Sequence, residues 1–180
     1  DNIAIGRSAL AVSAADGDQN IAIGVAALGA GLVTGFDNIA IGANAADAIV
    51  AGACNIAMGI NALGASQAGT YNIAMGKLAL GAGNVDGNNN IAIGQLALTA
   101  ATSNIDNIAI GRSALAVSDG DGDLNIAIGK AALGAGDVSG SDNIAIGTTA
   151  ADALTTGACN VAIGRNAYGT AAAGTYNLAL

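Results

Sequence analysis

The residues best suited to bind a metal ion lie in a single Asp–Gly run. Asp119, Asp121 and Asp123 alternate with glycines, and Asp16-Gly17-Asp18 is a shorter version of the same pattern. Carboxylate and backbone carbonyl oxygens at this spacing suit a hard cation such as calcium. The run lacks the later glutamate of an EF-hand and the nonapeptide pattern of calcium-binding β-rolls. A solvated acidic turn is therefore the favoured interpretation, calcium is the alternative, and no other cofactor is expected.

The side chains that usually perform acid–base and nucleophilic catalysis are missing from the sequence. It contains no His and no Glu, so all 13 acidic residues are Asp. A Ser-His-Asp or Cys-His site cannot form within one such chain, and a carboxylate pair would have to use turn aspartates. Gly29-Ala30-Gly31 and Gly81-Ala82-Gly83 resemble phosphate-binding loops, but they recur in successive repeats and open no helix, so we predict strand ends. The sequence thus predicts that the chain is not an enzyme.

The element that must position any such residue is a short repeat that runs from end to end. Asn-Ile-Ala-Ile-Gly recurs with few variations, and the spacing between successive repeat asparagines is always 17 or 18 residues. Such self-similarity is the signature of a solenoid. The repeat asparagines are Asn2, Asn20, Asn38, Asn55, Asn72, Asn90, Asn107, Asn125, Asn143, Asn160 and Asn177. The glycines that close the motif are Gly6, Gly24, Gly42, Gly59, Gly76, Gly94, Gly111, Gly129, Gly147 and Gly164.

Each repeat predicts one β-strand. In residues 20–24 large apolar and small residues alternate, the period-2 pattern of a strand with one buried face. We expect the two isoleucines to stack into the dry core, and the small-residue face of Ala4, Ala22 and Ala40 to point outward and contact a partner chain. The asparagines would form an amide ladder or cap turns, and each motif glycine would occupy a corner. The fold class is all-β: a single-chain parallel β-solenoid of about ten coils, roughly 50 Å long.

A longer period is superimposed on the coil. Residues 1–75 and 106–180 agree at about 54 of 75 positions, so a six-coil block of 105 residues, 1–105, repeats in 106–180. We interpret residues 1–180 as one continuous solenoid domain and as part of a longer array. Between the blocks Val25 becomes Lys130 and Ile60 becomes Arg165, which predicts an outer or interface position after the motif glycine.

The two cysteines occupy equivalent positions in the two blocks. Cys54 and Cys159 each stand directly before a repeat asparagine. Six coils, about 29 Å, would separate them, which is too far for a disulfide within one chain. Other coils carry Asp37, Tyr71 or Leu124 at this position, which indicates a partly exposed corner. A small residue in a turn and a disulfide between chains remain the two hypotheses.

Charge and hydropathy exclude further classes of partner. The net charge is −8, with five Lys and Arg in 180 residues, too few to neutralise a row of phosphates in a nucleic acid. Gly, Asn and Asp interrupt every apolar segment, so no membrane insertion is expected within these residues.

The Asn-x-Ala-x-Gly strand followed by a small-residue segment resembles the YadA-like head repeats of trimeric autotransporter adhesins, and similar repeats occur in bacteriophage long tail fibres. The resemblance covers essentially the whole chain and implies a left-handed β-roll that forms a homotrimer. The coil of 17 or 18 residues is longer than is typical of that family, and no coiled-coil heptads follow.

This resemblance implies a structural role outside the cell. We expect an extracellular fibre or adhesin-type rod that extends from a surface, self-associates as a homotrimer or filament, and presents loops to a host or cell-surface receptor. A bacteriophage tail-fibre shaft, in a virion, is one alternative. A soluble ice- or ligand-binding solenoid is another.

Overall fold

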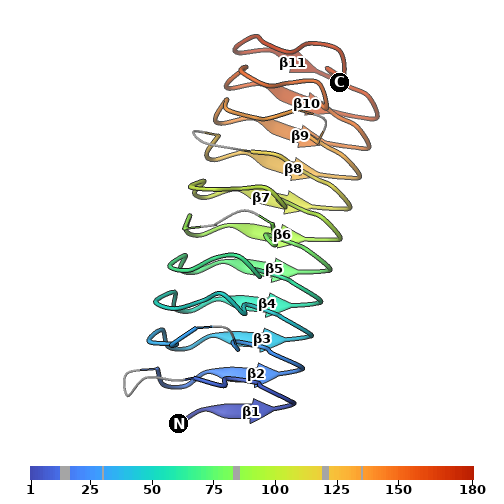
Figure 1. Ribbon diagram of the computed structural model, residues 1–180. Helices are drawn as coiled ribbons and strands as arrows, with labels where there is room; N and C mark the ends of the chain where they lie inside the picture. The colour runs from blue at the N-terminus through green and yellow to red at the C-terminus, as the bar shows by residue number, and fades with distance from the viewer. Residues whose placement is uncertain (13–16, 30, 83–85, 119–121, 135) are drawn as a thin grey trace.

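The fold is a single stack of parallel β-coils. The computed structural model describes residues 1–12, 17–29, 31–82, 86–118, 122–134 and 136–180. Its strands form one 11-stranded sheet in sequence order, and the described residues contain no helix. The two termini lie at opposite ends of the stack (Figure 1). The strands are β1 (Ile3–Ile5), β2 (Ile21–Ile23), β3 (Ile39–Ile41), β4 (Ile56–Met58), β5 (Ile73–Met75), β6 (Ile91–Ile93), β7 (Ile108–Ile110), β8 (Ile126–Ile128), β9 (Ile144–Ile146), β10 (Val161–Ile163) and β11 (Leu178–Ala179).

The register is identical at every step of the stack. Ile21 pairs with Ile39 and Ala22 pairs with Ala40, and the same correspondence holds from β1 to β11. Because each coil repeats the same motif, like residues lie above like residues. The predicted all-β parallel solenoid is therefore confirmed.

Turns whose residues have left-handed backbone angles carry the chain from each short strand round to the next one. Ala26 and Leu28, in the segment after the motif glycine, have φ values of 54° and 49°, and Gln19, before the repeat asparagine, has φ of 59°. Such angles cost a non-glycine residue roughly 1–2 kcal/mol. Hydrogen bonds between coils offset this cost, since the Ala26 and Leu28 amides donate to Arg7 and Ala45 carbonyls at 2.9 and 3.0 Å. Residues 25–28 thus form a turn, and Gly29 and Gly31, predicted as strand ends, belong to no strand.

The core is built from the opposite face to the one predicted. Ala22 is fully buried, whereas Ile21 and Ile23 are only half-buried, and β3–β10 likewise have a buried alanine between two large side chains that are half-buried or exposed. Leu28 and Val33 fill the interior of the coil, so only a methyl group fits where the strand faces them. The expectation that isoleucines form the core and Ala4, Ala22 and Ala40 form an outer interface is therefore wrong.

Candidate functional surface

A buried ladder of asparagine amides fixes which side of each strand faces inward. Asn38 is 1% exposed. Its side-chain Nδ2 donates to Asn20 Oδ1 at 3.0 Å and to the Gly52 carbonyl at 2.8 Å. Its Oδ1 accepts from the Asn55 backbone N–H at 3.0 Å. The amide therefore joins three successive coils and ties the strand to the far side of its own coil.

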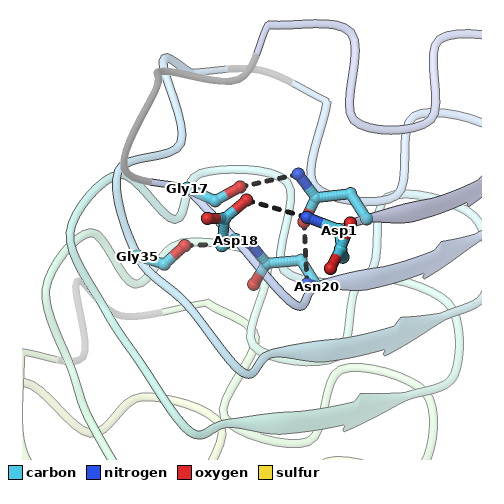
Figure 2. A network of polar contacts seen from close by, with 6 residues as sticks. Asp1, Gly17, Asp18, Asn20 and Gly35 are labelled. Atoms are coloured by element: carbon cyan, nitrogen blue, oxygen red, sulfur yellow. Dashed lines mark hydrogen bonds and ion pairs between the residues drawn. The ribbon is translucent and has the colours of Figure 1, made fainter.

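The same contacts are visible where the ladder begins (Figure 2). The Asn20 backbone N–H donates to Asn2 Oδ1 at 2.8 Å, and Asn20 Nδ2 reaches the Gly35 carbonyl at 2.9 Å. No buried side-chain nitrogen or oxygen among the described residues lacks a partner. A side-chain amide that is buried away from water needs hydrogen-bond partners, and the asparagine amides find theirs inside the stack. The asparagine therefore faces inward, and the isoleucines, which alternate with it along the strand, face outward.

The outward side chains of β1–β11 form a continuous apolar surface, which we call the isoleucine face. Each of the strands β2–β10 presents two large apolar residues, separated by a buried alanine. Ile93, Ile110 and Ile146 are 36–37% exposed even though neighbouring strands flank them. Ten steps of about 4.8 Å make the face roughly 48 Å long. A soluble monomer seldom leaves such a long apolar strip open to water.

Two straight files of residues border the isoleucine face. The corner file comprises the residues that precede the repeat asparagines; the Cys54 and Tyr71 amides donate to the preceding coil at 3.0 and 3.1 Å. The post-glycine file comprises the residues that follow the motif glycines, and the coil above donates to the Lys77 and Arg112 carbonyls at 3.0 and 2.9 Å. Val25 and Ile60 in this file are 43% and 52% exposed, which agrees with the predicted outer position.

The motif glycines allow the coils to approach closely at the end of each strand. Gly94 has φ of +134°, and a Cβ added there would lie 2.6 Å from the Gly111 carbonyl oxygen. The other motif glycines share this φ region. A side chain at this position would meet backbone that cannot move without breaking the stack.

Among the residues that the structure describes, the cysteines and aspartates singled out in the sequence are not brought together. Cys54 and Cys159 are free, half-buried members of the corner file. Asp119, Asp121 and Asp16 lie outside the described residues. Asp123 accepts a hydrogen bond from the Ile105 backbone N–H at 2.8 Å, and Asp18 forms an ion pair with the N-terminal ammonium at 2.9 Å (Figure 2). The interchain disulfide and calcium binding both stay predictions.

One carboxyl group has a perturbed acidity. Partial burial raises the pKa of Asp47 above its usual value, and hydrogen bonds from its own and the Ala48 backbone N–H groups oppose this shift. The group lies in the turn that follows β3, in a half-buried position. It stands alone, so the shift indicates local desolvation and not a paired-carboxylate site.

The described part of the chain carries no enclosed site. It has no pocket and no cluster of three or more His, Cys, Asp or Glu side chains placed to hold a metal ion. No helix among those residues has the length and apolarity needed to cross a bilayer. The candidate functional site is therefore a surface, the isoleucine face with its two bordering files.

The sequence contained a signal that could have identified this surface. Charged residues follow several motif glycines, five positions after the repeat asparagine, as in Arg7 and Lys77. These positions share the parity of the two isoleucines, so the charges mark that side of the strand as the outer one. No protein-family model, no curated protein and no solved structure matches this chain.

Proposed function

We propose that this chain is a structural rod of an extracellular fibre or adhesin, which extends from a surface and works as an assembly of identical copies. The isoleucine face is the observation that carries the proposal. It runs along the whole stack and leaves β-branched and other large aliphatic side chains partly exposed at every strand. Burial of such a strip against other copies would recover about 25 cal/mol for each Å² removed from water.

The rest of the molecule suits a role in extending from a surface and presenting loops. The coils are joined by in-register strands, by the asparagine ladder and by hydrogen bonds between turns. The turns opposite the isoleucine face differ in sequence from coil to coil and would be the segments presented to a receptor. A homotrimer is the assembly that we expect, with the three isoleucine faces enclosed at its centre.

Sedimentation equilibrium and electron microscopy of the purified chain test this proposal. We expect a stable oligomer, a trimer in the simplest case, seen as a short rod. Replacing Ile93 and Ile110 together by Lys should dissociate it, because two charges in each copy would enter the apolar contact. Leu32→Lys with Val50→Lys is the matched control, since both residues are exposed in loop segments outside the face. A wild-type chain that remains monomeric would contradict the proposal.

A further inference from the structure

We draw no further inference here: the strongest candidate, the surface patch of exposed Val12, Leu32 and Val50 in the loop segments that follow β1, β2 and β3, carries none because nothing in the structure shows what covers it.

Discussion

At the residue scale, the asparagine ladder supplies the polar contribution to an otherwise aliphatic core. Asn90 is fully buried; its Nδ2 donates to the Asn104 carbonyl at 2.7 Å, and its Oδ1 accepts from the Asn107 N–H at 3.1 Å. A single amide thus satisfies backbone groups from two other places in the stack. Buried backbone groups without partners are costly, so the ladder permits turns to lie against the core.

Replacing Asn90 by Ala should be strongly destabilising. The change removes the hydrogen bonds that the Asn90 side chain makes to Asn72 Oδ1, to the Asn104 carbonyl and to the Asn107 N–H, and the buried Asn107 N–H loses its acceptor. We expect the free energy of unfolding to fall by about 3 kcal/mol. Denaturant titration followed by circular dichroism measures the change. Gln95→Ala, at an exposed position of the post-glycine file, is the control and should alter stability by less than about 0.5 kcal/mol.

Asp47 should make stability depend on pH in an unusual direction for an aspartate. Because its pKa is raised in the folded chain, the folded state binds a proton before the unfolded state does as the pH falls. Its contribution to stability is therefore greatest below the unfolded value of 3.8 and is lost as the pH rises through the folded pKa. We expect Asp47→Asn to be more stable than wild type at pH 7. The difference should narrow toward pH 3, and a difference that stays constant between these pH values would contradict this assignment.

At the element scale, no strand of this protein is stable by itself. The strands contain three residues or fewer, and each one touches only the strands directly above and below it. Their stability comes from repetition, since each coil covers the apolar side of its neighbour. The motif glycines permit this spacing because their positive φ and missing Cβ let one carbonyl lie against the next coil.

Gly94→Ala should therefore be far more harmful than its small size suggests. The new methyl group would collide with the Gly111 carbonyl, and φ of +134° is strained for any side chain. We expect a loss of about 3 kcal/mol or more in the free energy of unfolding, measured by thermal and denaturant melts. Gly64→Ala is the matched control, because a Cβ there lies 3.3 Å from its nearest neighbour, the Asn61 carbonyl oxygen. Equal losses in both variants would refute this account.

At the scale of the whole molecule, the stack behaves as a one-dimensional array. Each strand pairs only with the strands that precede and follow it in the sequence. Removal of one coil would therefore leave the same kind of contact between all the coils that remain. The array has no central residue on which the others depend. The isoleucine face and its two bordering files run along the whole rod.

Deletion of one whole coil should be tolerated. Removing residues 56–72 joins Asn55 to Ile73 and restores the repeat in register. The shortened chain should fold, with a denaturant m-value lower by about a tenth because less surface becomes exposed on unfolding. Removing residues 64–72 cuts half of a coil and should abolish cooperative folding. Comparable stability of the two deletions would show that register is not what holds the stack together.

The sequence by itself determined the repeat, the strand in each coil and the parallel stacking. Identical motifs at a fixed spacing can bury their apolar residues only against one another, so Asn20 and Asn38 had to lie one above the other. Gly24 likewise indicated a corner before its φ of +137° was seen. These features depend on local pattern and spacing, which a sequence displays directly.

Only the tertiary structure showed what fills the interior of the coil and therefore why the alanine face of the strand lies inside, although the charges after the motif glycines already indicated the outer side. Alternation of Ile21 and Ala22 defines two faces but assigns neither, because both are apolar. The assignment came from distant parts of the coil: Leu28 and Val33 fill the interior, and the Asn20 amide must reach the Gly35 carbonyl. Little room then remains opposite the strand, so alanine turns inward. The isoleucines and the two bordering files are left on the outside, where another copy can meet them.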